Sequence, residues 1–448
     1  MKKVLFLIGG LLSSLAINAQ TLSYGDISIL FSGEENNGTA RFNAMSGAFG
    51  ALGGDMSAGD INPAGLAIFK ETETSISFGL RNTDIISVFA GSSTINNNDY
   101  LNMTQAGGVM VFDTRHNSNW SKIALGINYS LSNDFENIWF ASGNSEFAPN
   151  TDIHDPNLVY GIAEEQAFEN FTDGRNDKFV FSIAAQHDEN LYLGASVNTY
   201  NIEYFQLTFA QELNNDGNGN TFDVFADQEL ETIGYGISFS VGAIFKPSQE
   251  TRFGISFQSP TWYELSERRS IFDHELVFNE TDSEFVSPDG AGTTIFDYQL
   301  NTPSKLTGSF AYIVGKEGLI SFDYTYKNYQ DIKLKPTSLF AVENADFSNF
   351  LKGTSSFKVG AEWRLDNISL RGGYHFEESP FKDALDTDNI EGYSFGVGFK
   401  LNGNIKLDLA YQNSTNTGFY DFLNVADVPA TELEITNDKY TATLVIGL

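Results

Sequence analysis

Residues 235–245 read YGISFSVGAIF, and this stretch decides the fold class. Large apolar side chains alternate along it with Gly and Ser, which is the pattern of a β-strand with one apolar face and one face of small residues. The same period of two recurs from about Thr72 onward, and charged residues join the small ones in several repeats, at 179–185, 357–365, 368–376, 393–401 and 405–411. The chain is therefore predicted to be all-β.

The bulky face of these strands is the apolar one, and no helical pattern accompanies the strands that could cover it. A lipid-facing exterior around a polar lumen produces this arrangement, so we predict a transmembrane antiparallel β-barrel. Because lipid cannot hydrogen-bond to open strand edges, the barrel must be closed. About fourteen strands are expected, near 72–80, 103–113, 121–133, 179–187, 191–209, 234–245, 252–263, 302–313, 318–326, 356–365, 368–376, 392–401, 405–411 and 439–448.

The lengths of the connections support the barrel independently. Barrels of this class place short turns on the periplasmic side and long loops outside. Tight connections are expected at 187–190, 246–251, 315–317, 366–367 and 402–404. Long ones are expected at 81–102, 134–178, 210–233, 264–301, 327–355, 377–391 and 412–438. The two kinds alternate along the chain, and a globular sandwich has no reason to sort its loops in this way.

The first residues and the composition narrow the class of protein further. Lys2 and Lys3, the apolar run after them and Ala19 predict a signal peptide over 1–19, so we expect the outer membrane. The 26 Lys and Arg stand against 58 Asp and Glu, a net charge of −32, which excludes nucleic acid as a partner. The chain has no Cys, so disulfides and Cys-ligated metals are also excluded.

Residues 20–70 do not alternate, and we expect them to form a plug, or hatch, inside a barrel made of residues 71–448. A barrel of about fourteen strands is too wide for side chains alone to fill it. The dense small residues of this segment permit close packing of backbones, whereas a periplasmic linker, which is the alternative, seldom carries so many large apolar side chains. Those residues, Phe42, Phe49, Leu52, Ile61 and Leu66, are candidate ligand contacts.

Two parts of this segment resemble a known family. The run ARFNAMSGAFGAL at 40–52 and the run GGDMSAGDINPAGLA at 53–67 look like the FadL/TodX family of outer-membrane transporters for long-chain fatty acids and other hydrophobic compounds. The resemblance implies a hatch motif at Asn62, Pro63, Ala64 and Gly65; the alternative is an ordinary turn. It also implies a lateral opening at a kink in the third strand, where Gly126 is the candidate weak point. A relative of that family serves protein secretion, so the resemblance leaves the cargo open.

Aromatic residues gather in the longest expected loop. Phe135, Trp139 and Phe140 are the candidates for a groove that removes water from an apolar ligand, and Phe147, Phe168 and Phe171 accompany them. The alternatives are a small core within the loop or a belt at the level of the lipid headgroups.

Charged residues point into the lumen from the late strands, at Lys358, Glu362, Arg364, Arg371, His375, Lys400, Lys406 and Asp408. They are expected to pair across strands, and the alternative is that they bind a carboxylate headgroup. No metal or other cofactor is expected: in the loop at 214–220, Phe225 stands where a calcium loop needs its chelating carboxylate. Nor is an enzyme expected, because His375 near Ser369 is the only Ser–His pairing to consider.

The sequence as a whole predicts passive transport of hydrophobic small molecules such as long-chain fatty acids across the outer membrane. The expected partners are the hydrophobic ligand, outer-membrane lipid and lipopolysaccharide. The alternative is a barrel that holds a surface or secreted protein at its extracellular loops. A continuous apolar cavity beside 42–66, with a gap near the third strand, favours uptake. A filled lumen with an apolar patch on the extracellular side favours the protein partner.

Overall fold

The computed structural model describes residues 21–114, 119–146, 150–152, 155, 157–272, 274–278, 283–286, 292–401, 403–422 and 428–448. The expected signal peptide and Phe147 lie outside these residues. Among the residues described, no helix is both long and apolar enough to cross a membrane.

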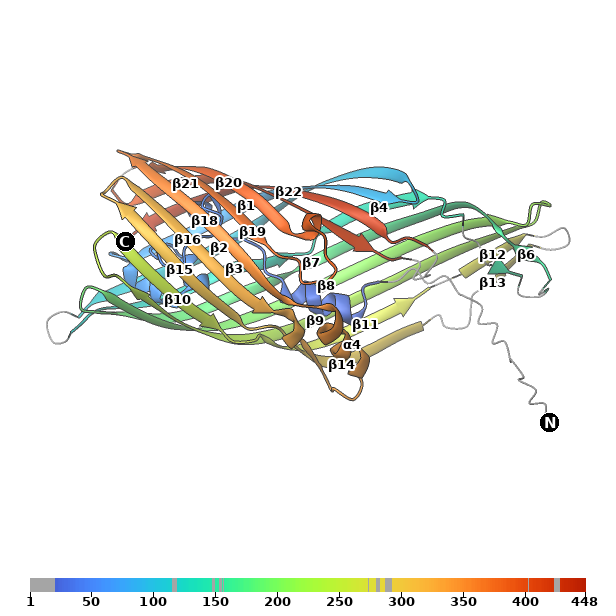
Figure 1. The fold of residues 1–448 in the computed structure, drawn as a ribbon, viewed down its shortest axis with the longest axis horizontal. Coiled ribbons are helices and arrows are strands. Elements are labelled where there is room, and N and C mark those ends of the chain that lie inside the picture. Colours follow the sequence, from blue (N-terminus) through green and yellow to red (C-terminus); the bar gives the residue numbers. More distant parts are fainter. Residues whose placement is uncertain are drawn as a thin grey trace, which may run out of the picture.

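Over this part of the chain, an antiparallel sheet closes into a barrel with fourteen strand positions, which confirms the predicted fold (Figure 1). Most positions are single strands, namely β1 (Glu73–Phe89), β2 (Ser92–Asp113), β7 (Ile162–His187), β8 (Leu191–Asn215), β9 (Thr221–Phe245), β18 (Gly353–Leu365), β19 (Ile368–Glu377), β20 (Ile390–Lys400), β21 (Ile405–Tyr420) and β22 (Thr431–Gly447). Pairing of β1 with β22 closes the cylinder.

The remaining positions are built from consecutive shorter strands. They are β3 (Trp120–Asp134) with β4 (Asn137–Gly143), β10 (Thr251–Gln258) with β11 (Trp262–Ile271), β14 (Gly292–Asn301) with β15 (Lys305–Val314), and β16 (Gly318–Asn328) with β17 (Lys333–Lys335). Two small hairpins, β5 (Asn150–Thr151) with β6 (Val159–Tyr160) and β12 (His274–Phe278) with β13 (Ser283–Val286), lie in the connections.

The outward face of β9 shows where the lipid ends. Between Phe245 and Ile233 it carries large apolar side chains, and Tyr235 is 74% exposed. This length of strand, about 41 Å at about 3.4 Å per residue, covers about 29 Å of height at a tilt of about 45°. The value agrees with a hydrocarbon core about 30 Å thick. The next outward residues are Glu231 and Glu229, so the strand leaves the membrane there.

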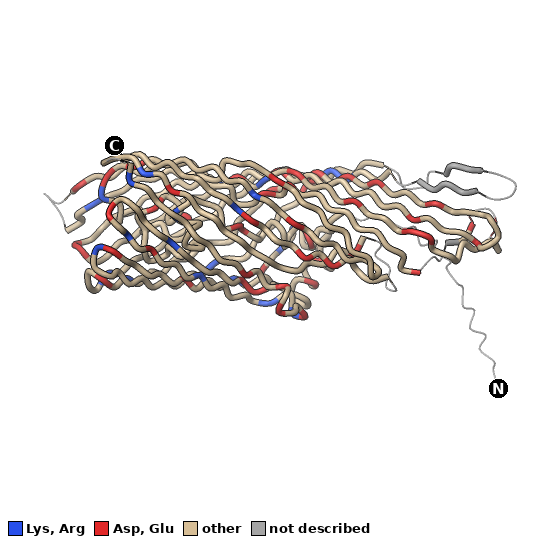
Figure 2. Tube along the Cα trace, turned by 90° about the horizontal axis from the view of Figure 1, so that it is seen from above, with Lys and Arg blue, Asp and Glu red and all other residues tan. Residues whose placement is uncertain are grey.

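Beyond the lipid the strands continue into a long extension, seen at the right of Figure 1. β7 has 26 residues and β8 and β9 have 25 each, far more than the roughly ten needed to cross a membrane. The long loops expected at 81–102 and 210–233 are instead parts of β1 with β2 and of β8 with β9. The sequence pattern missed these strands because polar and apolar residues are mixed on their outward face, as at Ile95 and Asp99, and among the charged residues Asp and Glu predominate along the extension (Figure 2).

The interior of the extension holds a hydrophobic core of its own. Phe89, Trp139, Phe168 and Phe422 are nearly or fully buried in it, and the rings of Phe168 and Phe422 stack with centroids 4.5 Å apart. The extension therefore does not form an open funnel.

The short turns lie at the other end of the barrel, where the Leu448 amide donates to the Thr72 carbonyl over 2.9 Å. By the rule for this class of barrel, this end is periplasmic.

The N-terminal segment, residues 21–72, runs through the lumen. It contains α1 (Tyr24–Ser32), α2 (Ala40–Asn43), α3 (Ala58–Ile61) and a 3₁₀ helix, η1 (Pro63–Ile68). In the extension the Leu22 amide donates to Gln206 Oε1 of β8 over 2.8 Å, and near the periplasmic turns Lys122 Nζ of β3 donates to the Phe69 carbonyl over 2.6 Å. Both ends of the segment are thus attached to the wall.

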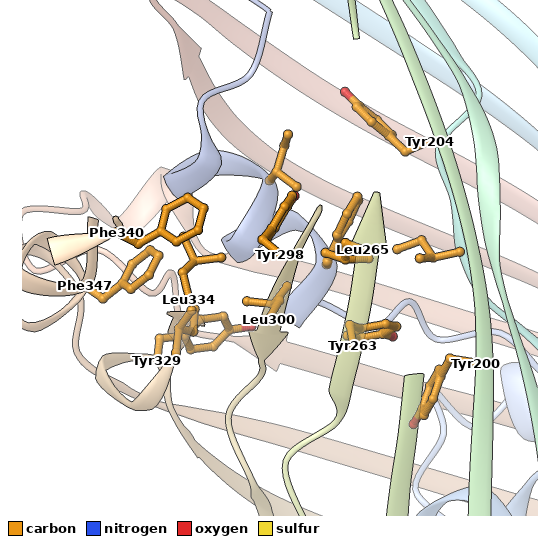
Figure 3. Close-up of a cluster of buried hydrophobic side chains, with 14 of the residues drawn as sticks. Tyr200, Tyr204, Tyr263, Leu265, Tyr298, Leu300, Tyr329, Leu334, Phe340 and Phe347 are labelled. Atoms are coloured by element: carbon orange, nitrogen blue, oxygen red, sulfur yellow. The ribbon is translucent and has the colours of Figure 1, made fainter. Parts of the chain in front are cut away.

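Helix α1 lies in a cluster of aromatic and aliphatic side chains, which we call the aromatic cradle (Figure 3). Ile27 and Phe31 of α1 are buried there, against residues that include Phe135, Tyr204 and Tyr298. The connection between β16 and β18, with η2 (Tyr329–Asp331) and α4 (Ala341–Phe350), covers part of the cradle through Phe340 and Phe347.

A further 3₁₀ helix, η3 (Asp386–Asp388), precedes β20.

Candidate functional site

Asn62 ties two parts of the N-terminal segment to the barrel wall. Its amide nitrogen donates to the Gly50 carbonyl over 2.8 Å and to the Ala243 carbonyl of β9 over 3.2 Å. Its side-chain oxygen accepts from the Ala64 amide over 3.1 Å, which caps η1 just before Pro63. Asn62 is 1% exposed, so each of these groups would lose a buried partner if the side chain were removed.

Glycine residues in the wall leave room for this turn where the two are in contact. A Cβ on Gly242 would overlap Asn62 Oδ1, and a Cβ on Gly194 would overlap the backbone of Pro63 and Ala64. Gly65 in turn packs on Gly53 across the segment, where a Cβ would lie 3.0 Å from the Gly53 Cα. The Gly positions on the lumen face of the alternating strands therefore mark where backbone packs on backbone.

An ion cluster attaches the segment to another part of the wall, at β18. Arg41 Nε lies 2.8 Å from Glu362 of β18, which also pairs with Arg371 at 2.7 Å and with Arg364 at 2.6 Å. Arg371 continues to Asp408 at 2.5 Å. Cross-strand pairing of these lumen charges was expected; the participation of Arg41 was not, because the strand pattern contains no information on what the lumen holds.

Asp323 of β16 provides a third attachment. One of its carboxylate oxygens accepts from the Phe49 amide over 3.0 Å and from the Gly50 amide over 2.9 Å. Asn62 also binds Gly50, so this residue is held from two sides of the barrel.

A polar chamber of about 90 Å³ lies beside the segment, between α1 and α3 along the chain. Lys178, Lys305, Lys327 and Lys358 reach it from four strands. Lys305 pairs with Glu34 of the segment at 2.6 Å, Lys327 lies 3.7 Å from Glu377, and Lys358 donates to Asn36 over 3.1 Å. Phe42 and Ile61 contribute apolar lining. The chamber is thus charged, and it is not the continuous apolar cavity that would favour uptake.

Basic residues of the wall lower the pKa values of two glutamates in the segment. Burial raises the pKa of Glu34, but Lys305, Lys178 and Lys327 lower it by more, so the pKa lies well below its usual range. Burial also raises the pKa of Glu35, and Lys439 and Arg81 reverse that effect and lower it. Both side chains are therefore ionised at neutral pH and hold the segment electrostatically.

The barrel ladder is broken on one side of the chamber. β2 pairs with β3 only from Asp113 with Lys122 to Gln105 with Ser130, although β2 continues to Ser92 on the edge of β1. Past that point β3 and β4 stay paired to β7 alone. The wall between β2 and the β3–β4 edge therefore has no backbone ladder over this length.

Side chains span the break instead of backbone. Asn102 Nδ2 of β2 donates to Asp134 over 3.0 Å, and Asn98 Nδ2 donates to the Ile138 carbonyl over 2.8 Å. Arg81 binds Asp134 at 3.1 Å and lies over the Tyr100 ring at 4.9 Å. A cavity of about 20 Å³, room for one water molecule, lies here. Among its lining residues are Tyr100, Thr104 and Leu131.

The candidate residues from the sequence fall into several places. Phe42, Phe49, Leu52 and Ile61 pack together between the segment and the wall, whereas Leu66 packs near β3 in a separate cluster. Phe135 is in the aromatic cradle, and Trp139 and Phe168 are in the core of the extension. Phe140 and Phe171 face outward, 41% and 36% exposed, so the loop aromatics do not form one groove.

Two further expectations are resolved by the geometry of the strands. Gly126 is paired with both β2 and β7 and faces Leu66, so the ladder is intact there, and the break begins beyond Ser130. A register shift between Leu131 and Asn133 accompanies the break. Ser369 and His375 lie about 20 Å apart along β19, too far for a catalytic pair.

The comparisons with known proteins agree with this architecture. A sequence model described as outer membrane protein transport protein (OMPP1/FadL/TodX) matches residues 31–417. No curated protein matches the chain.

Solved structures share the fold. A FadL homologue from Pseudomonas aeruginosa aligns with a TM-score of 0.62 at 13% identity, over 93% of this chain and 99% of that one. The toluene transporter TodX from Pseudomonas putida aligns with a TM-score of 0.58 at 12% identity, over 92% and 99%. The toluene transporter TbuX from Ralstonia pickettii aligns with a TM-score of 0.54 at 16% identity, over 91% and 98%.

Proposed function

The chain belongs to the outer-membrane transport family of OMPP1, FadL and TodX, and on this premise we propose that it carries hydrophobic small molecules such as long-chain fatty acids passively across the outer membrane. In this proposal the N-terminal segment is the hatch, and the break between β2 and the β3–β4 edge is the lateral opening.

The main support for the proposal is the missing backbone ladder between β2 and the β3–β4 edge. A barrel stays sealed because every strand edge is paired, and an edge without a partner has a cost in lipid that only a function explains. Here Asn98, Asn102 and Arg81 close the wall with side chains, which can rotate away more readily than a ladder can separate. The lower end of the break, just beyond Gln105 and Ser130, is the part next to the lipid-facing band, and a ligand that leaves there enters the membrane without crossing the periplasmic end of the lumen.

The aromatic cradle is the apolar surface best suited to a ligand. Ile27 and Phe31 of α1 occupy it, with Phe31 and Tyr204 ring centroids 5.8 Å apart. An acyl chain in their place would gain about 0.8 kcal/mol for each CH₂ removed from water. We therefore propose that a ligand displaces α1, so that the cradle is occupied by either the helix or the ligand.

The described state is closed. The chamber of about 90 Å³ is small beside the roughly 300–1,000 Å³ of typical ligand pockets. Transport therefore requires movement of the hatch, and the attachments at Arg41, Asp323 and Asn62 determine how far it moves.

A covalent bridge across the break tests the proposal. Because the chain has no Cys, only the introduced thiols react. Asn102→Cys with Asp134→Cys places two thiols across the break, which a short bis-methanethiosulfonate reagent can join through reducible disulfides. Asn82→Cys with Asp99→Cys is the matched control, because that Asn–Asp pair, 2.8 Å apart, spans the intact ladder between β1 and β2.

Uptake of a radiolabelled long-chain fatty acid and of toluene is then measured in cells that lack their own transporters. Bridging the break is expected to lower uptake at least tenfold, with recovery after reduction, and bridging the control pair is expected to leave uptake unchanged. Equal uptake by the bridged and unbridged forms would rule out the break as the exit.

A further inference from the structure

The outer face of the extension carries an apolar patch above the membrane. Six outward side chains from three adjacent strands form it: Ile138, Phe140, Phe171, Phe205, Leu207 and Phe209. Register places Ile138 opposite Phe171, and Phe171 opposite Leu207. The Phe171 and Phe205 rings meet edge to face at 6.2 Å. Four of the six are 36–41% exposed.

A polar belt separates this patch from the lipid-facing surface. On β7 the outward residues between Phe179 and Phe171 include Arg175 and Asp177, an ion pair at 3.2 Å. On β8 the corresponding residues are Asn201 and Glu203, opposite Asp177 and Arg175. In the register of β7, β8 and β9, Phe171 lies four residues beyond the level of Ile233, where the apolar band of β9 ends. That is about 14 Å along the strand, or about 10 Å in height at a tilt of about 45°, so hydrocarbon tails do not reach it. Apolar surface at this level faces water unless another molecule covers it.

The rim of the patch is acidic. Glu169 lies between Phe140 and Phe209 in the register, and Asp173 and Glu203 lie on the side facing the belt. On β9, Glu229 faces Leu207 and Glu231 faces Phe205, and Arg268 compensates part of this charge through its pair with Glu231 at 2.9 Å. Acidic residues also predominate over the whole extension (Figure 2).

We propose that this patch binds a protein that presents an apolar surface rimmed by Lys and Arg, on the extracellular side of the membrane. A basic rim matches the acids around the patch, whereas a second copy of this chain would bring acid against acid. Lipopolysaccharide is also anionic, and the same acids repel it. The proposal does not depend on transport through the lumen, because every residue of the patch faces away from it.

Site-specific photo-crosslinking in cells of the organism that makes the protein tests the proposal. A photoreactive phenylalanine analogue replaces Leu207 in the patch or Val197 in the lipid-facing band. The two positions are matched, since both lie on the outward face of β8 and are 38% and 37% exposed. The expected result is one protein adduct at Leu207 that is absent at Val197, with the crosslinked partner peptide on a surface rich in Lys and Arg.

Charge reversal distinguishes recognition from chance proximity. Asp173→Lys with Glu203→Lys is expected to lower the Leu207 adduct at least tenfold while heat-modifiable mobility on gels shows that the barrel still folds. Raising the ionic strength to about 0.5 M is expected to lower the adduct without any mutation. An adduct with lipopolysaccharide alone, an adduct with a second copy, the same adducts at both positions, no adduct, or an adduct insensitive to charge reversal would each overturn the proposal.

Discussion

Asn62 Oδ1 occupies the space in which a side chain on Gly242 would begin. The hatch motif and the wall of β9 are therefore fitted to each other at the level of single atoms. Any Cβ at position 242 must push the Asn62 side chain away from the partners that it binds.

Gly242→Val is accordingly expected to loosen the hatch without unfolding the barrel. Overpacking of a tight contact costs about 1–3 kcal/mol, and here the hatch is the part that can move. Cells that make this variant should become sensitive to a large hydrophilic antibiotic that the wild-type lumen excludes. Gly308→Val is the control, because a Cβ at Gly308 has no atom within 4 Å. Equal sensitivity of the two variants would contradict the fit between Asn62 and Gly242.

Asn62→Ala is expected to lower the free energy of local unfolding of the hatch by about 2–4 kcal/mol, because the Gly50 carbonyl and the Ala64 amide lose a buried partner. Hydrogen exchange measured by mass spectrometry on peptides from 50–70 should quicken accordingly. Asn62→Asp keeps the acceptor for the Ala64 amide but puts a buried carboxylate oxygen against the Gly50 and Ala243 carbonyls, so its exchange should be at least as fast as that of Asn62→Ala. Unchanged exchange in Asn62→Ala would show that the turn holds itself together.

Glu362→Gln is expected to destabilise the protein more than Arg41→Ala. Glu362 is the shared partner of Arg41, Arg364 and Arg371, so its neutralisation leaves the mostly buried Arg41 without a carboxylate, at a cost of up to about 3 kcal/mol, while Arg371 keeps Asp408 and Arg364 reaches solvent. Arg41→Ala leaves Glu362 with two partners. Urea unfolding in detergent should give this order, and the double variant should be no worse than Glu362→Gln alone. An additive double variant would show that Arg41 and Glu362 act separately.

Acidification is expected to release the middle of the hatch. The pKa of Glu34 is held below its ordinary value of 4.5, chiefly by Lys305 against the effect of burial. A carboxylate with a lowered folded-state pKa stabilises at pH values above 4.5, and this contribution is lost as the pH falls from there through the folded-state value. Glu35 acts in the same direction.

The rate at which a thiol reagent modifies Ser32→Cys reports this release, because Ser32 is buried at the end of α1. The rate, divided by that of a fully exposed thiol at the same pH, should rise as the pH is lowered below about 4.5, because the thiolate fraction falls equally in both. With Glu34→Gln and Glu35→Gln added, this normalised rate should be high and nearly independent of pH over the same range. A pH profile that survives both substitutions would assign the effect to other groups.

Locking the hatch to the wall is expected to stop transport. The hydroxyls of Ser46 in the hatch and Ser394 on β20 are 2.8 Å apart, so Ser46→Cys with Ser394→Cys can form a disulfide. Ser270 and Thr293, whose hydroxyls are 2.9 Å apart, join β11 to β14 within the wall and give the control pair. Oxidation should reduce fatty-acid uptake for the first pair alone, with recovery on reduction. Undiminished uptake with a complete hatch disulfide would mean that ligand passes without movement at Ser46.

The lipid-facing surface could be predicted from the sequence because it depends on one property, the alternation of bulk along each strand. The same rule failed in the extension, where Glu229 and Glu231 face water and the strand reads as a loop. Cross-strand pairs such as Glu362 with Arg371 follow from neighbouring strands, but Arg41 joins them from a segment more than three hundred residues away.

The break in the wall was expected on the third strand but not at its true position. Gly126 is a flexible residue, yet its neighbours on both sides hold it in the ladder. Whether a strand edge is paired depends on the course of the adjacent strand, and β2 leaves β3 after Gln105 with no Gly or Pro at that step. One strand read alone does not contain that information.

The seam of the cylinder is formed against the N-terminal segment. The Ala40 amide donates to the Thr443 hydroxyl of β22 over 2.6 Å, and that hydroxyl lies 2.8 Å from Ser77 of β1. Closure of the cylinder and seating of the segment therefore share one chain of hydrogen bonds, so a change at Thr443 acts on both.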